Sequence, residues 1–149
     1  YLERLHRVLS KHRSNDDTVF FLDQGPVYRL AYLYMSYSDI IRDQSFEPWW
    51  TRMLDDWAST LDLIFRVDAQ DEVLLKRIRT RSKWHIVKNS PEEEAREFLA
   101  RFRKARWQII SELSADGGPR VFCFATDQEP LDQIVDRILN MLNPENGGP

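Results

Sequence analysis

The sequence predicts an α/β fold in which helices cover both faces of a parallel sheet. Short runs of β-branched and aromatic residues alternate with longer amphipathic segments along the 149 residues. Strands that alternate with helices indicate a parallel sheet, because each helix carries the chain back across the sheet. No internal repeat or domain boundary interrupts this order. We therefore expect one domain over residues 1–142 and a disordered tail over residues 143–149.

The charge balance of the chain argues against nucleic acid and membrane partners. The chain has 21 basic and 24 acidic residues, a net charge of -3. This mixture creates no broad positive field of the kind that gathers nucleic acid or anionic membrane. No apolar run approaches the roughly 20 residues that span a bilayer, and the first residues lack a signal-peptide pattern. We expect a cytoplasmic protein whose partner is a small molecule, not a nucleic acid polymer or a membrane; a homodimer stays open.

The single cysteine, Cys123, lies among Val121, Phe122 and Phe124. This setting predicts a small buried apolar residue. One cysteine forms no disulfide within the chain and no cysteine metal cluster, so a reducing compartment is favoured.

Three helices and one strand are expected before residue 62. Leu2, Leu5 and Leu9 recur at helical spacing. The run Thr18–Leu22 follows the polar break Ser14–Asp17 and is rich in β-favouring residues, which predicts a buried strand. Two helices follow, with stripes of Val27, Leu30, Ala31 and Tyr34 in the first and, after Pro48, of Trp50, Met53, Leu54, Trp57 and Leu61 in the second.

The second half is predicted to contain two strands and three helices. Leu63–Val67 and Arg120–Ala125 have strand composition. Ser90 is expected to cap a long helix, with Pro91 at its first position and Glu93 completing a capping box. The inward stripes of the three helices are Leu74, Leu75 and Ile78; Ala95, Phe98, Leu99, Phe102, Ile109 and Leu113; and Leu131, Ile134, Val135, Ile138, Leu139 and Leu142.

Each predicted strand ends in a short polar turn. The turns are Asp23–Gly25, Asp68–Gln70 and Thr126–Gln128. Ligands of open α/β sheets lie at the carboxyl ends of the strands, so we expect these turns to share one rim. The carboxylate of Asp23 could hold a hydrated magnesium ion or orient a phosphate acceptor, and Gly25 would allow close backbone approach. The alternative is that Asp23 and Gly25 only build a turn.

A basic cluster ends the helix after the second of these strands; its members are Lys76, Arg77, Arg79, Arg81, Lys83 and Lys88. Arg77 and Arg81 are four residues apart and share a helical face, so they could converge on the charge of a transferring phosphoryl group. The alternative is a solvated face paired with Asp71 and Glu72. The polar stretch Ser82–Ser90 that follows could be a mobile lid.

Aromatic residues are frequent in the two helices after Asp23: Tyr28, Tyr32, Tyr34, Tyr37, Trp49, Trp50 and Trp57. They could stack a planar substrate near the Asp23 turn, and core packing is the alternative. The sequence has no Gly-x-Ser-x-Gly elbow, no Gly-x-Gly-x-x-Gly turn and no metal-ligand spacing of His and Cys. Hydrolase and dinucleotide-binding functions therefore lose support.

The order of these features resembles the C-terminal two-thirds of P-loop nucleoside and nucleotide kinases of the thymidylate kinase-like or deoxynucleoside kinase-like type. The best stretch is Asp62–Ala69 with Glu72–Arg81, which resembles the strand, turn and arginine-bearing helix before the lid. Thr18–Gly25 resembles the strand that carries the catalytic or magnesium-linked acid. Phe124–Leu131 resembles the last strand and the loop near the nucleotide base.

The resemblance implies an ATP-dependent kinase that uses magnesium and a small-molecule acceptor, a nucleoside or nucleotide. It implies that Asp23 is catalytic and binds the metal. Catalytic and nucleotide-binding roles fall to Arg77 and Arg81, nucleotide-binding roles to Thr126 and Asp127, and acceptor-binding roles to Gln24, Gly25 and Tyr28.

The chain departs from the family pattern in two ways. The family often has an arginine after the acid, where this chain has Gln24, so the acceptor contacts and the substrate class stay open. The chain also lacks the Gly-x-x-x-x-Gly-Lys-Ser/Thr motif that holds nucleotide phosphates. In the family the strand before that motif lies between the strands that Thr18–Leu22 and Leu63–Val67 resemble, and its removal would leave two unpaired edges.

We therefore predict that the natural protein has an upstream segment with this strand and a phosphate-binding loop. Two other functions stay open. One is a P-loop-derived module that binds a partner without catalysis, and the other is a sulfotransferase of related architecture, against which the basic lid-like segment argues.

Overall fold

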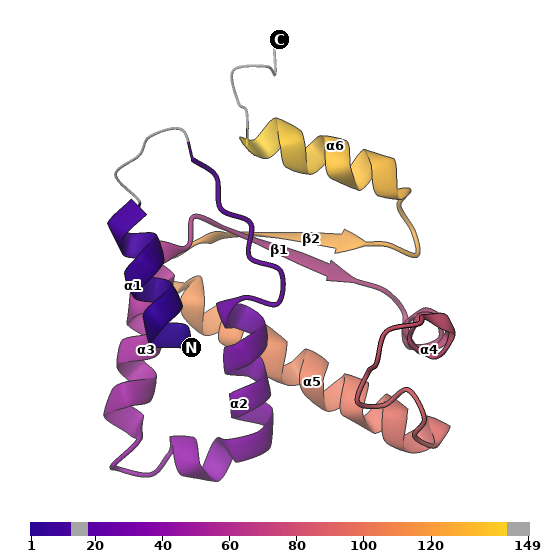
Figure 1. Cartoon of the computed structure of the whole chain (residues 1–149), viewed down its shortest axis with the longest axis horizontal. Helices are drawn as coiled ribbons and strands as arrows, with labels where there is room; N and C mark the ends of the chain where they lie inside the picture. The colour runs from indigo at the N-terminus through magenta and orange to yellow at the C-terminus, as the bar shows by residue number, and fades with distance from the viewer. Residues whose placement is uncertain (13–17, 143–149) are drawn as a thin grey trace. The chain divides into compact units, whose positions relative to one another are not determined.

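The computed structural model describes residues 1–12 and 18–142, and these residues form six α-helices and a two-stranded parallel sheet (Figure 1). The predicted mixture of helices and parallel strands is confirmed. The chain divides into two compact units, the first made of residues 1–64 and 97–121 and the second of residues 65–96 and the chain from Phe122 onward. The single domain stays a prediction, and the predicted tail at 143–149 lies outside the described residues.

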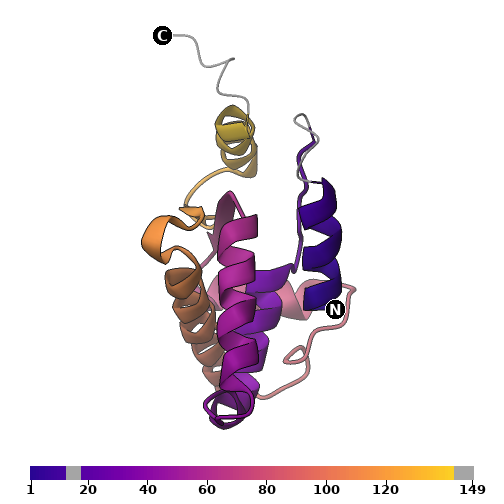
Figure 2. The same ribbon diagram turned by 90° about the vertical axis from the view of Figure 1, so that its left-hand side faces the viewer.

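The first unit is helical. It contains α1 (Leu2–His12), α2 (Pro26–Ile41), α3 (Glu47–Thr60) and the greater part of α5 (Glu92–Leu113), which is followed by the short 3-10 helix η1 (Ala115–Gly117). The helix α3 contacts both α1 and α2, and Figure 2 shows α1 and α3 side by side. Prolines in the first turns of α2 and α3 favour these starts, since proline lacks the N–H that the first turn leaves unbonded.

The predicted apolar stripes of these helices meet in one core. Trp57, Leu30 and Ala31 are fully buried, and Trp50 is 6% exposed. The Trp57 ring meets that of His6 edge-on at 5.6 Å between centroids, and Trp50 stacks with Tyr34 at 6.3 Å. Trp57, Trp50 and Tyr34 therefore pack the core. Its buried members are Leu2, Leu30, Ala31, Ile41, Trp50, Met53, Trp57, Ile64, Ala105, Ile109, Ile110 and Leu113.

The second unit contains the greater part of the sheet. Strand β1 (Leu63–Asp68) pairs with β2 (Arg120–Ala125), and the helices are α4 (Asp71–Thr80) and α6 (Leu131–Leu142). The ring of Phe65 lies 6.0 Å from that of Phe122 and 6.1 Å from that of Phe124. The Arg137 guanidinium of α6 lies 4.8 Å from the centre of the Phe124 ring, so α6 covers this side of the strand.

The predicted strand at Thr18–Leu22 is wrong. The segment is not a strand, and the sheet of the described residues consists of β1 and β2 alone. Its side chains Val19, Phe20 and Phe21 are 56%, 49% and 65% exposed. Its composition favours a strand, but a strand also needs a neighbour that accepts and donates backbone hydrogen bonds. The described residues supply none to this segment.

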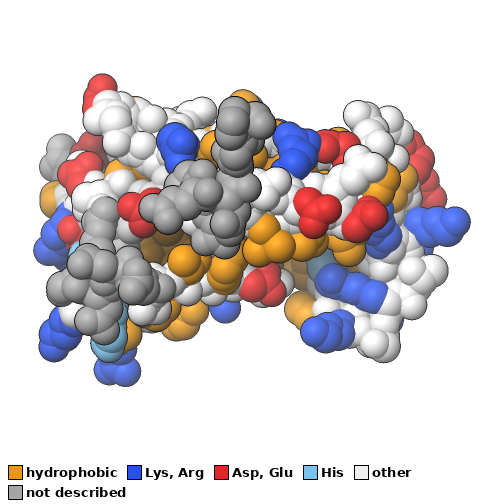
Figure 3. Space-filling model, turned by 90° about the horizontal axis from the view of Figure 1, so that it is seen from above, with side chains coloured by type: hydrophobic (Ala, Val, Ile, Leu, Met, Phe, Trp, Pro, Cys, Tyr) orange, Lys and Arg blue, Asp and Glu red, His pale blue; other side chains and the backbone are white. Residues whose placement is uncertain are grey.

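Two predictions of burial are also wrong. Cys123 is exposed, because it points to the side of β2 opposite Phe124, which is buried. In α6 only Ile134 of the predicted stripe is buried, while Leu131, Val135 and Leu139 are 69%, 44% and 50% exposed. Hydrophobic side chains thus reach the surface, as the orange atoms of Figure 3 illustrate.

The helix α5 begins at Glu92, and the Pro91 carbonyl accepts the N–H of Ala95, so the start lies one residue after the predicted one. Such a shift is within the usual uncertainty of helix ends.

Across the described ranges, no helix combines the length and the apolar character that crossing a bilayer requires.

Candidate functional site

The Asp23 turn leads directly into α2 in the first unit. Asp23 is exposed, and Gln24 has a positive φ of 49°. Gly25 is the N-cap residue of α2, and Pro26 starts the helix. A β-carbon added at Gly25 would lie 2.8 Å from the Leu22 Cβ and 3.3 Å from the Leu22 carbonyl oxygen. The glycine is therefore required by the close approach of Leu22.

Substituting Gly25 with Ala should lower the free energy of unfolding by about 1–3 kcal/mol, the usual cost of overpacking a filled site. The new methyl group would force the backbone at Leu22 or Gly25 to shift. Urea unfolding followed by circular dichroism measures the change. Gln24→Ala is the matched control, because residue 24 already carries a β-carbon and its side chain is exposed. Equal stability of the two variants would contradict the packing explanation.

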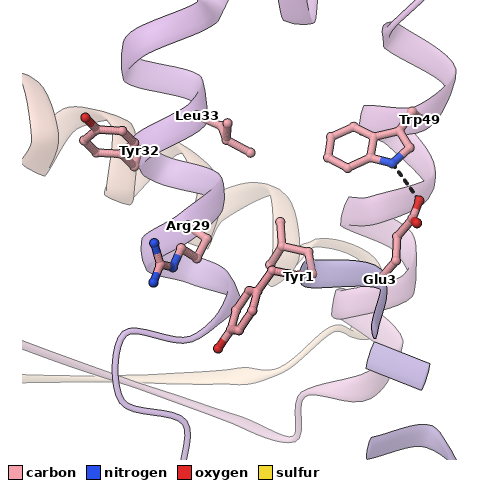
Figure 4. A pocket seen from close by; sticks show the side chains of 7 residues that line it. Tyr1, Glu3, Arg29, Tyr32, Leu33 and Trp49 are labelled. Carbon is pink, nitrogen blue, oxygen red and sulfur yellow. Dashed lines mark hydrogen bonds between the residues drawn. The ribbon is translucent and has the colours of Figure 1, made fainter. Parts of the chain in front are cut away.

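A pocket of about 550 Å³ lies in the same unit (Figure 4). Leu33 of α2 and Trp49 of α3 point toward one another across it, and Tyr1 and Glu3 come from the start of the chain. The indole Nε1 of Trp49 donates to the Glu3 carboxylate at 2.8 Å, which fixes the ring. The volume is in the range of small-molecule sites. The lining residues are Tyr1, Leu2, Glu3, Arg29, Tyr32, Leu33 and Trp49.

Arg29 is the cation of this pocket. Its guanidinium carbon lies 5.4 Å from the centre of the Tyr1 ring and 5.9 Å from that of Tyr28, within the range of cation–π contacts. Tyr28, a predicted acceptor-binding residue, also meets Phe102 edge-on at 5.2 Å. Tyr28 is therefore partly a packing residue that supports Arg29.

In the second unit, hydrogen bonds connect two of the predicted polar turns. The Arg77 guanidinium donates to the Thr126 hydroxyl at 2.6 Å and to the Thr126 carbonyl at 3.0 Å. The Thr126 hydroxyl donates in turn to the Asp68 carbonyl at 3.1 Å. Arg77, from the helix after β1, thus binds the turn after β2, at the carboxyl ends of two parallel strands.

Asp127 strengthens this junction. Its carboxylate accepts the backbone N–H of Gln70, the N-cap residue of α4, at 3.1 Å. On the β1 side, Arg66 donates to the Asp68 carboxylate at 2.5 Å, and the other Asp68 oxygen accepts the N–H of Ala69 at 3.0 Å. We call Arg77, Thr126, Asp127 and Asp68 the strand-end cluster. It provides a cation and several oriented polar groups in one place.

Arg81 does not join this cluster. The helix α4 ends at Thr80, and Arg81 has an extended backbone, with φ -70° and ψ 148°. Its guanidinium lies 3.5 Å from the carbonyl of Trp84, and its own carbonyl accepts the Lys88 ammonium. The expected shared face of Arg77 and Arg81 is therefore lost at the helix end, and the two side chains bind different parts of the second unit.

An ion network ties α4 to the start of α5 beside a second pocket of about 370 Å³. Arg96 contacts Glu72 at 3.0 Å and Glu92 at 2.8 Å, and Arg79 contacts Glu92 at 3.4 Å. The pKa of Glu92 is lowered first by its hydrogen bond from Arg96 and then by that cation's charge. This network holds both ends of the loop between α4 and α5, so Arg79 has a structural partner.

The predicted site residues are therefore distributed over both units. Asp23, Gln24, Gly25 and Tyr28 belong to the first unit, and Arg77, Arg81, Thr126 and Asp127 belong to the second. The structure brings Arg77 and Thr126 into direct contact.

Among the pocket residues that lie on α2, Arg29 and Leu33 were not predicted from the sequence. With Tyr32 they follow helical spacing on one face of α2, and that signal could have revealed them.

In the described part of the chain, no group of three or more His, Cys, Asp or Glu side chains is placed to hold a metal ion. Magnesium is usually bound by one or two carboxylates together with water and phosphate oxygens. Asp23 provides one exposed carboxylate.

Comparison of the chain with protein-family models, with characterised proteins and with solved structures finds no match.

Proposed function

We propose that this chain is part of an ATP-dependent kinase that phosphorylates a small molecule, a nucleoside or nucleotide. The observation that carries the proposal is the strand-end cluster. Arg77 links the polar turns that follow two parallel strands, which is where open α/β sheets bind their ligands. A cation held in this way is suited to stabilise the charge of a phosphoryl group during transfer.

The residues divide into two groups by role. In the second unit, Arg77 and Arg81 contact the nucleotide phosphates, and Thr126 and Asp127 orient the turn beside the nucleotide. ATP with magnesium supplies the phosphoryl group. In the first unit, Asp23 takes the proton of the acceptor hydroxyl or holds the magnesium ion through water, and Gln24, Gly25 and Tyr28 contact the acceptor.

The pocket in the first unit supports an acceptor with a planar ring. Arg29, Tyr32 and Leu33 lie within about the first two turns of α2, the helix that follows the Asp23 turn. Trp49 and Tyr1 add aromatic surface, and Arg29 adds a cation that can meet a carbonyl or phosphate oxygen.

The phosphate-binding loop is proposed to lie in a segment of the full-length protein outside these 149 residues. Thr18–Leu22 supports this, because it has strand composition and half-exposed apolar side chains but no strand partner in the described residues. Sequencing the protein upstream of Tyr1 tests the proposal. A full-length protein without a phosphate-binding loop would favour the non-catalytic binding module instead.

Arg81→Ala in the full-length protein should lower kcat about tenfold to a hundredfold and leave the unfolding midpoint unchanged, because Arg81 is exposed and acts on the developing charge. A coupled assay of ADP formation measures the rate. Arg79→Ala is the matched control, a neighbouring exposed arginine whose partner is Glu92. Equal rates for the Arg81 variant and the unmodified protein would show that Arg81 has no role in transfer.

A further inference from the structure

The loop between α4 and α5 exposes a tryptophan side chain. Trp84 is 79% exposed and Ile86 is 46% exposed. An indole ring left in water forgoes the free energy of burial, and tryptophan is enriched where proteins meet their partners. Tryptophan is also the side chain with the largest flat face for stacking. Trp84 is therefore a candidate for contact with a ligand.

The loop is a folded structure with an anchor. Val87 is 5% exposed, and its N–H donates to the His85 Nδ1 at 3.3 Å. The Lys88 N–H donates to the His85 carbonyl at 3.0 Å, and the Lys88 ammonium donates to the Arg81 carbonyl. These bonds order the segment from Arg81 to Lys88, which includes Trp84 and is called the tip below. Less ordering is therefore required when a ligand binds there.

The charges around Trp84 define the chemistry of the ligand. Arg81 and Lys83 are exposed, and Lys88 is partly exposed. The pKa of His85 is lowered by partial burial and then by the charge of Arg81, which favours the neutral form of this ring. The tip thus combines one aromatic face with three cations, which matches an anion that carries a flat ring.

The extent of the basic surface favours a small ligand over a membrane or a nucleic acid polymer. The first turn of α5, which follows the loop at once, contains Glu92, Glu93 and Glu94. An extended anionic surface that reached past the loop would meet these three carboxylates. A ligand of a few phosphates needs only the tip.

We infer that Trp84 stacks on the base of a nucleotide whose phosphates contact Arg81, Lys83 and Lys88. The inference rests on the proposed function, and it assigns to this loop the recognition of the nucleotide ring in addition to its phosphates. Stacking on a tryptophan is tolerant of base identity, because every base has a π face. Affinity therefore depends on the presence of a ring at residue 84 and of a base in the ligand.

The test measures binding to the full-length protein by calorimetry, with magnesium-ADP and with magnesium-tripolyphosphate as probes. Trp84→Ala should weaken ADP binding roughly tenfold to a hundredfold and change tripolyphosphate binding less than about twofold. Trp84→Phe should keep most of the ADP affinity. Trp107→Ala, which removes another exposed indole at 48% exposure, should bind ADP as the unmodified protein does.

A second readout is tryptophan fluorescence, which ADP should quench in the unmodified protein but not in Trp84→Phe. Equal ADP affinity of Trp84→Ala and the unmodified protein overturns the inference and leaves the proposed kinase function intact. An equal loss of tripolyphosphate affinity also overturns it, since Trp84 would then only support the loop. Binding to phosphatidylserine vesicles through Trp84, with ADP affinity unchanged, would replace it with a membrane contact. Absence of ADP binding to the unmodified protein would overturn both proposals.

Discussion

Asp23→Asn in the full-length protein should lower kcat by about 100- to 10,000-fold, the usual contribution of a general base. The substitution keeps the shape of the side chain and removes its charge and its ability to accept a proton. Because Asp23 is exposed in a turn, the folded structure should be unchanged. ADP formation under saturating ATP and acceptor measures the rate, and the thermal unfolding midpoint measures the fold.

Asp39→Asn is the matched control for this substitution, because Asp39 is an exposed carboxylate in the following helix, α2. Its rate should equal that of the unmodified protein. If Asp23 acts mainly through magnesium, raising the magnesium concentration should restore part of the activity of Asp23→Asn. A rate within threefold of the unmodified protein at all magnesium concentrations would remove Asp23 from the mechanism.

Trp57→Ala should lower the free energy of unfolding by about 3–5 kcal/mol, the range measured for large aromatic residues in cores. Trp57 is fully buried in the core of the first unit and lies against His6. Domains are stable by only about 5–15 kcal/mol, so this loss should remove a large share of the stability. Urea unfolding followed by circular dichroism provides the measurement.

Trp57→Phe is the matched control. It keeps an aromatic ring and removes the Nε1–H, which is buried and has no hydrogen-bond partner among the described residues. An unsatisfied buried donor is unfavourable, so its removal offsets part of the lost packing. The phenylalanine variant should therefore unfold at a higher urea concentration than the alanine variant. A cost below about 1 kcal/mol for Trp57→Ala would contradict the central place of this ring.

Much of the helical structure could be predicted because it depends on local pattern. Trp50, Met53 and Trp57 recur on one face of α3, and all three are buried. Leu30 and Ala31 of α2 follow the same rule. A helix forms its own backbone hydrogen bonds, so spacing and composition within one segment are enough to indicate it.

The sheet could be predicted only in part, since strands depend on partners. Leu63–Val67 and Arg120–Ala125 were predicted as strands and pair with each other in the structure. Thr18–Leu22 has a similar composition but no partner among the described residues, and it is not a strand. The prediction that Cys123 is buried was wrong for a related reason. The sequence does not show which side of a strand is covered by another element.

The candidate site, too, could be predicted only in part from the sequence. The polar turns at the ends of the strands and the aromatic helices after Asp23 were recognised from short stretches of sequence. The contact of Arg77 with Thr126 joins residues 49 positions apart, and the bond from Trp49 to Glu3 joins residues 46 apart. Arg81 left the expected face because α4 ends one residue before it.

Whether a feature could be predicted depends on how far apart in the sequence its interacting residues lie. Helix periodicity, turn chemistry and the basic character of the loop around Trp84 are local properties and could be identified directly in the chain. The pairing of strands, the exposure of Cys123 and the partners of Arg77 and Trp49 depend on distant segments. Only the tertiary structure brings those segments together, because many arrangements of the same local elements satisfy the local rules equally well.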